Sequence, residues 1–145
     1  MIIIAQRVSS SSVAVDGKIV GSIDKGLMLL IGVHKDDTES SADHLAAKCA
    51  DLRIFPDESG KMNLSLKDID GEALAISQFT LLGNCSKGRR PNFTDAAPAE
   101  KGRLLYEYFV SKLKTHVRKV ETGIFGADMK VTLVNDGPVT ITING

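Results

Sequence analysis

Two short polar segments carry the groups best suited to chemistry. The first, Ser77–Leu81, reads Ser-Gln-Phe-Thr-Leu and ends an apolar run that begins at Ala73. Ser77 and Gln78 interrupt that run, so hydroxyl, amide and backbone N–H groups gather where a strand is expected to end. A strand end of this kind can present preorganised donors to an oxyanion. The plainer alternative is a strand whose last residues simply alternate polar and apolar.

The second segment, Asn135–Thr140, reads Asn-Asp-Gly-Pro-Val-Thr. An Asp-Gly pair favours a hairpin turn, after which Pro138 would begin a strand. The alternative is a rigid elbow that offers bare backbone carbonyls, because Gly137 permits close approach and proline fixes φ. Only about 5–6% of X–Pro bonds are cis, so the residues alone favour a trans Gly137–Pro138 bond.

Other catalytic patterns are missing. His34, His44 and His116 are scattered, and neither HxxxH nor CxxC spacing occurs. The sequence therefore predicts no metal site. It contains no glycine-rich phosphate loop and no GxSxG elbow, so no nucleotide cofactor is expected. Cys85 lies near basic residues that would lower a thiol pKa, but it has no histidine partner nearby, which favours an incidental thiol.

Length and charge narrow the class of protein. The 145 residues suit one domain spanning 1–145. The 18 basic and 18 acidic residues give no net charge, which argues against a protein that grips nucleic acid over its whole surface. Tryptophan is absent and aromatic residues make up 5%, so the core must be mainly aliphatic.

The charge is unevenly distributed, however. Residues 86–119 contain nine basic and three acidic residues, which gives +6 there and −6 in the rest of the chain. The basic members are Lys87, Arg89, Arg90, Lys101, Arg103, Lys112, Lys114, Arg118 and Lys119. A solvated helix face and a local patch for phosphates are both compatible with this run.

Compartment signals point to the cytoplasm. The longest apolar run, Gly26–Val33, is far shorter than the roughly 20 residues that a bilayer requires. The N-terminus lacks the basic region of a signal peptide. In a reducing compartment, Cys49 and Cys85 are expected to be free thiols.

The elements that must position these segments are mostly strands. Asp16–Gly17 predicts a two-residue hairpin. Helices are expected over about 13 residues from Asp36 and over Pro98–Arg118, each with one apolar stripe. The expected strands or strand runs are Ile2–Val8, Val13–Val15, Lys18–Val20, Gly26–Val33, Leu52–Phe55, Ala73–Leu82, Gly123–Phe125, Met129–Val134 and Val139–Ile143. The order β-rich, helix, β, helix, β indicates an α+β fold: a curled antiparallel or mixed sheet, barrel-like, with two flanking helices.

Taken together, the two segments resemble the signature motifs of the D-aminoacyl-tRNA deacylase family, also called D-tyrosyl-tRNA(Tyr) deacylases. Four further segments match the same pattern in order, so the resemblance spans essentially the whole chain. They are Gln6–Val8, Gly60–Leu64, Arg90–Phe93 and Phe125–Met129.

The resemblance implies a cytoplasmic homodimer that hydrolyses the ester between a D-amino acid and the terminal adenosine of tRNA, and that also acts on glycyl-tRNA. It implies no metal and no cofactor. In the family the Gly-Pro bond is cis. By this match, Gly137-Pro138 would enter the partner subunit's pocket and hold the substrate's amino group. An L side chain would find no room there, and Arg7 would brace the elbow.

The resemblance also distributes roles around Ser77–Leu81. Backbone N–H groups of Phe79 and Thr80 would stabilise the oxyanion, whereas Ser77 and Gln78 would shape the pocket. Thr80 is a candidate nucleophile without an evident base, so attack by water aided by the tRNA 2′-hydroxyl is preferred. Phe125 and Met129 would flank the adenine, and the basic stretch would meet acceptor-stem phosphates.

Three other functions are alternatives to a D-aminoacyl-tRNA deacylase. A paralogous deacylase with a trans elbow removes L-alanine from mischarged tRNA(Thr), but Phe79 and the Val139-Thr140 pair favour the D-specific form. A non-catalytic nucleic-acid-binding module would be expected to carry an added basic tail, whereas this sequence stops at Gly145. A plain scaffold would leave both motifs without a purpose.

Overall fold

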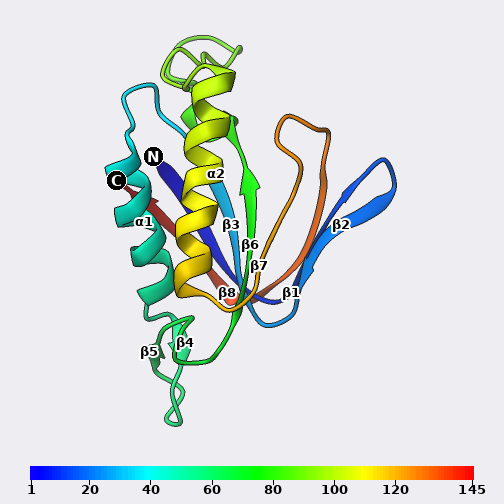
Figure 1. The fold of residues 1–145 in the computed structure, drawn as a ribbon, viewed down its shortest axis with the longest axis vertical. Coiled ribbons are helices and arrows are strands. Elements are labelled where there is room, and N and C mark those ends of the chain that lie inside the picture. The colour runs from blue at the N-terminus through cyan, green and yellow to red at the C-terminus, as the bar shows by residue number, and fades with distance from the viewer.

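A long first strand organises the sheet in the computed structural model, which describes residues 1–145 (Figure 1). One edge of β1 (Ile2–Val15) pairs first with β3 (Gly26–Gly32) and then with β2 (Lys18–Ile23). Its other edge pairs with β8 (Lys130–Asn144), and all three pairings are antiparallel. The strand therefore joins both ends of the chain to the middle of the sheet.

The other half of the sheet is parallel. β6 (Glu72–Ser77) runs parallel to β3, and β7 (Val120–Thr122) runs parallel to β6. The sheet then curls until β2 approaches β7: a Cβ on Gly21 would lie 2.7 Å from the carbonyl oxygen of Thr122. The expected curled, mixed, barrel-like sheet is confirmed.

Two helices cover one face of this sheet, side by side (Figure 1). They are α1 (Glu39–Asp51) and α2 (Ala99–His116), close to their predicted bounds. The larger core lies between them and the sheet and is mainly aliphatic; its fully buried large side chains include Ile3, Leu27, Leu29, Ile31, Leu45, Phe55, Leu66, Phe109 and Leu113. A smaller core of Val8, Val13, Ile23, Met28, Leu74 and Ile76 is a separate cluster of buried strand residues.

Strand bounds differ from expectation where distant pairing decides them. The strand expected to end at Val8 continues through the serine run to Val15, because β8 pairs along it and the buried Ser11 hydroxyl donates to the Thr132 carbonyl at 3.0 Å. The predicted hairpin at Asp16–Gly17 is confirmed, with positive φ at both residues. The two C-terminal strands expected on either side of the elbow form one bulged strand, β8.

Three further predicted strands have different bounds in the structure. The strand expected at Leu52–Phe55 is reduced to β4 (Phe55–Pro56), which pairs with β5 (Met62–Leu64). The strand expected at Gly123–Phe125 lies earlier, at β7. The run Ala73–Leu82 is strand only to Ser77 and then becomes the 3-10 helix η1 (Phe79–Leu82). No helix in the chain has both the length and the apolar character needed to cross a bilayer.

Candidate functional site

A cavity of about 520 Å³ opens where β6 ends. That volume lies within the about 300–1,000 Å³ typical of small-molecule sites. Five of the nine candidate residues line it: Ser77, Gln78 and Phe79 from one segment, and Phe125 and Met129 from another. The full lining is Ile76, Ser77, Gln78, Phe79, Ala99, Phe125, Gly126, Ala127, Met129 and Val131.

The turn that forms one wall of the cavity is built by an interrupted parallel ladder. The Gln78 N–H donates to the Ile31 carbonyl at 2.7 Å, which completes the last pair of the β3–β6 ladder, Ile31 with Ser77. The chain then turns into η1, which packs closely on β3: a Cβ on Gly32 would lie 2.6 Å from the Leu82 side chain. The absence of a side chain at Gly32 thus sets the position of the turn.

This turn leaves two backbone donors ahead of its first internal hydrogen bond. Leu81 N–H donates to the Gln78 carbonyl at 3.3 Å, and Gly83 N–H donates to the Thr80 carbonyl at 3.0 Å. The amides of Phe79 and Thr80 precede these bonds, and the first amides of a helix have no acceptor within it. Neither amide is a donor in the hydrogen bonds that close the turn.

The side chains of Gln78, Phe79 and Thr80 in this turn lie in different surroundings. The Gln78 amide Nε2 donates to the Thr80 hydroxyl at 2.5 Å. Thr80 is exposed and does not line the cavity. Phe79 does line the cavity although it is 59% exposed, and the centroids of its ring and the Phe93 ring lie 5.1 Å apart in an edge-on arrangement.

The opposite wall is aromatic and apolar, and α2 supports it. The Phe125 ring lies 6.0 Å from the Tyr106 ring, and the buried Tyr106 hydroxyl donates to the Ala75 carbonyl at 2.8 Å. Burial raises the pKa of Tyr106, so this hydroxyl stays protonated. Met129 packs where a side chain at Gly123 would collide with its sulfur. Tyr106 went unnoticed in the sequence because it reads as one more apolar position on the helix stripe.

No titratable side chain lines the cavity. Its residues offer one hydroxyl, one carboxamide and backbone groups among apolar walls. The chain has no group of three or more His, Cys, Asp or Glu side chains arranged to hold a metal ion. Chemistry in this cavity must therefore draw its polar assistance from fixed dipoles or from the bound molecule itself.

The elbow arises from a bulge between β1 and β8. Gln6 pairs with Thr140 and Val8 pairs with Asn135, so residues 136–139 project from the sheet. The Asn135 side chain closes the base of the bulge: its Oδ1 accepts from Val139 N–H at 3.2 Å and its Nδ2 donates to the Thr140 hydroxyl at 3.0 Å. The sequence did not single out Asn135 as a brace, because only the register brings its partners together.

At the tip of the bulge, the Gly137–Pro138 bond is cis and both residues are exposed. Arg7 reaches the bulge from β1. Its Nε donates to the Asp136 carbonyl at 3.1 Å, and its Nη1 donates to the Ile54 carbonyl at 2.6 Å. Its Nε also lies 3.4 Å from the Asp136 carboxylate. Arg7 thus contacts Asp136, the residue just before Gly137, and ties it to the segment at Ile54.

Within one chain, the elbow and the cavity are separate features. Gly137, Pro138 and Arg7 do not line the cavity. The nine candidate residues thus fall into a cavity group, an elbow group, and Thr80 on the outer side of the turn.

Not all nine basic side chains of residues 86–119 carry unpaired positive charge. Arg103, Lys112, Arg118 and Lys119 each form an ion pair with a carboxylate. Lys101 and Lys114 on α2 form none. The exposed side chains of Lys87, Arg89 and Arg90 are also unpaired. We call residues 84–92, which carry those three unpaired side chains, the basic loop. The loop follows η1 directly, so its free positive charge lies close in sequence to the turn at the cavity.

Comparison with known proteins is consistent over nearly the whole chain. The sequence profile of the family described as D-Tyr-tRNA(Tyr) deacylase matches residues 4–144. A D-aminoacyl-tRNA deacylase of Caldicellulosiruptor saccharolyticus is 59% identical over 97% of this chain and 95% of its own length. One of Thermosipho melanesiensis is 57% identical, with the same coverage.

Two solved structures share the fold. A c-Myc DNA unwinding element binding protein is 38% identical with a TM-score of 0.95, covering 100% of this chain and 99% of its own. A probable eukaryotic D-amino acid tRNA deacylase is 18% identical with a TM-score of 0.84, covering 98% and 97%, which shows the fold alone. With the matching profile and relatives, the chain belongs to the D-Tyr-tRNA(Tyr) deacylase family.

Proposed function

We propose that this protein hydrolyses the ester between a D-amino acid and the 3′-terminal adenosine of tRNA, releasing the free D-amino acid and tRNA. The observation that carries the proposal is the cavity beside Ser77–Thr80, where two backbone amides precede the first bond of η1. Two relatives named D-aminoacyl-tRNA deacylase are each 59% identical to the chain. Their name states the same reaction.

The chemistry follows from the kind of groups present. Water attacks the ester carbonyl, and the amides of Phe79 and Thr80 bind the resulting oxyanion; each such donor contributes about 10²–10³ in rate. No titratable side chain lines the cavity, so the 2′-hydroxyl of the adenosine assists the attacking water. Collapse of the intermediate breaks the ester bond, and the 3′-oxygen takes up a proton as the tRNA leaves.

Different residues of the lining contact different parts of the substrate. Phe125 and Met129 offer apolar surfaces that flank the adenine, and Phe125 is held in place by Tyr106. Ser77 and Gln78 orient the aminoacyl group at the turn. Thr80 acts through its backbone amide, because its side chain lies outside the cavity and bonds to Gln78.

Rejection of L-amino acids requires a second copy of the chain. The exposed carbonyls around Gly137-Pro138 enter the partner's cavity, bind the substrate's amino group and leave no room for an L side chain. Glycyl-tRNA is accepted because glycine has no side chain to exclude. Two observations support this homodimer: the braced elbow does not line the cavity beside Ser77–Phe79 in its own chain, and β8 pairs on one edge only, with Val134 56% exposed. Unpaired edges of long strands invite pairing with another chain.

The tRNA body meets the basic loop. Lys87, Arg89 and Arg90 bind acceptor-stem phosphates, so replacing all three by Gln should raise KM for aminoacyl-tRNA. It should also flatten the dependence of binding on salt by about one unit of slope per lysine or arginine lost. An unchanged salt slope would move the tRNA contact elsewhere. We place this activity in the cytoplasm, where charged tRNA is used.

The test is hydrolysis of D-tyrosyl-, L-tyrosyl- and glycyl-tRNA side by side. Rapid loss of the D-tyrosyl and glycyl esters, with the L-tyrosyl ester spared, supports the proposal. Preferential loss of the ester of L-alanyl-tRNA(Thr) would instead support the trans-elbow paralogue. No hydrolysis of any ester, with binding of nucleic acid retained, would favour a binding module.

A further inference from the structure

We infer that Phe93 is a positioning residue for the reaction proposed above: it holds the Phe79 ring, and with it the turn at Gln78–Thr80, against the cavity. The inference rests on the proposed function for its kinetic consequences. Its structural content stands on contacts within this chain.

The contact itself involves an otherwise exposed ring. Phe79 is 59% exposed although it lines the cavity, and Phe93 is its one aromatic neighbour, with the ring planes at 62°. Gly83 makes room for this contact, because a Cβ there would lie 3.0 Å from the Phe93 ring and 2.9 Å from the Thr80 carbonyl oxygen. The Phe93 ring thus lies against the turn at two places, the Phe79 ring and Gly83.

Phe93 is held on its N-terminal side by a closed loop base. Asn84 and Asn92 exchange two backbone hydrogen bonds, of 2.8 and 3.0 Å. Their side chains each cap the amide two residues on, at Ser86 and Thr94. The basic loop is therefore closed at its base by an isolated β-bridge, and Phe93 follows Asn92 directly.

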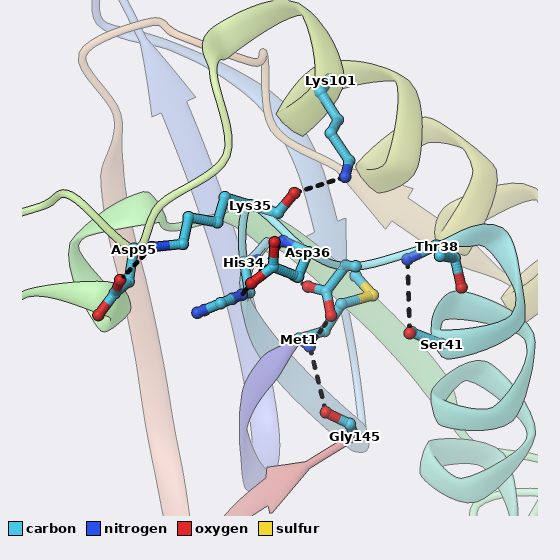
Figure 2. A network of polar contacts seen from close by, with 10 residues as sticks. Met1, His34, Lys35, Asp36, Thr38, Ser41, Asp95, Lys101 and Gly145 are labelled. Carbon is cyan, nitrogen blue, oxygen red and sulfur yellow. Dashed lines mark hydrogen bonds and ion pairs between the residues drawn. The ribbon is translucent and has the colours of Figure 1, made fainter.

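Phe93 is held on its C-terminal side by Lys35, in the segment between β3 and α1. Lys35 grips Asp95 twice, through its ammonium at 2.8 Å and through its backbone N–H, which donates to the Asp95 carbonyl at 2.9 Å. Lys101 of α2 in turn donates to the Lys35 carbonyl at 2.5 Å, and Figure 2 shows this chain of contacts from α2 through Lys35 to Asp95. Phe93 is thus a fixed point against which the more exposed Phe79 ring rests.

The consequence is a link between the basic loop and the cavity. The loop binds phosphate with exposed side chains, whereas Phe93 acts on the turn that carries the oxyanion donors. Loss of the loop's charge should therefore weaken substrate binding, and loss of the Phe93 ring should slow turnover. A displacement of about 1 Å in a reacting geometry can lower the rate by about 10²-fold.

The kinetic test compares Phe93→Leu, which keeps bulk but removes the ring, with Phe93→Tyr, which restores it. We expect Phe93→Leu to lower kcat about tenfold or more, with KM little changed, on both D-tyrosyl-tRNA and the minimal ester D-tyrosyl-adenosine. Phe93→Tyr should recover the wild-type rate. Leu104→Ala, a truncation of another exposed apolar side chain, is the matched control. In Phe79→Leu, adding Phe93→Leu should cause little further loss.

A second readout does not depend on activity. The chain has no tryptophan, so Phe79→Trp introduces a single indole at the turn, which can be excited apart from the two tyrosines. Adding Phe93→Leu should lower the fluorescence anisotropy of that indole at an unchanged fraction of folded protein, and Phe93→Tyr should not. Unchanged anisotropy together with unchanged kcat overturns the positioning role. If the wild-type protein hydrolyses no D-ester, the proposed function fails, and the anisotropy alone still decides the role of Phe93.

Discussion

Gly137→Ala should destabilise the fold through a contact that can be identified in advance. Gly137 has φ of +126°, and a Cβ there would lie 2.8 Å from Arg7 Nη2 and 2.9 Å from Val139 Cγ2. A non-glycine residue in such a sparsely populated conformation costs about 1–3 kcal/mol. Arg7 must also move, which breaks its exposed bond to the Asp136 carbonyl and costs about 1.5 kcal/mol more, at the low end for charged groups.

The predicted loss for Gly137→Ala is therefore about 2.5–4.5 kcal/mol in the free energy of unfolding. Gly60→Ala is the matched control, because Gly60 has φ of +78° but nothing within 4 Å of its added Cβ. Strain alone should cost that variant about 1–2 kcal/mol. In an Arg7→Ala background, Gly137→Ala should lose its extra penalty, giving a coupling of about 1.5 kcal/mol, within the range for contacting residues.

Urea unfolding followed by circular dichroism measures all four variants. Protein concentration must be held constant, because association with a second copy would add to the apparent stability. Equal losses for Gly137→Ala and Gly60→Ala would refute the reasoning. So would an unchanged cost of Gly137→Ala after Arg7 is removed, since the clash with Arg7 would then play no part.

Three further changes test other parts of the account. Thr80→Ala keeps the backbone amide, so D-ester hydrolysis should stay within about tenfold of wild type, whereas a loss of 10³-fold or more would identify the hydroxyl as the nucleophile. Burial raises the pKa of the Cys49 thiol to about 12, whereas Cys85 is exposed; a thiol reagent at pH 8 should therefore label Cys85 in the native protein and Cys49 only after unfolding, and rapid native labelling of both would contradict the buried site. Tyr106→Phe removes the buried bond to the Ala75 carbonyl and should lower the unfolding free energy by about 1 kcal/mol, which denaturant titration would detect; no loss would mean that the hydroxyl adds nothing.

Much of the fold could be predicted because local patterns agreed with tertiary packing. The stripe of Leu105, Phe109 and Leu113 predicted the buried face of α2, and all three are buried. The serine run was misjudged because its strand character depends on β8, more than 100 residues away along the chain. The shift from strand to η1 at Phe79 was also hidden, since it depends on close packing over Gly32.

The sequence singled out residues of the candidate site but did not show how they are arranged in space. Short motifs identified the turn at Ser77–Thr80 and the elbow at Gly137-Pro138, but only the structure shows that the two lie apart within one chain. The sequence did not show which contacts support the site, although Asn135 and Phe93 both lie in segments that it singled out. Asn135 becomes a brace through the β1–β8 register, and Phe93 reaches Phe79 across a loop whose charges dominate its composition.

The central claim is that one subunit's cavity works with the other subunit's elbow, and mixed dimers test it most directly. Ala127→Phe fills the cavity and Gly137→Ala disrupts the elbow; each variant should be nearly inactive alone on D-tyrosyl-tRNA, once shown to be folded. After unfolding and refolding together in equal amounts, random pairing should restore about a quarter of the wild-type rate, because half the dimers are mixed and each has one intact site. L-tyrosyl-tRNA should remain spared. No recovery from dimers proven to be mixed would contradict the shared site.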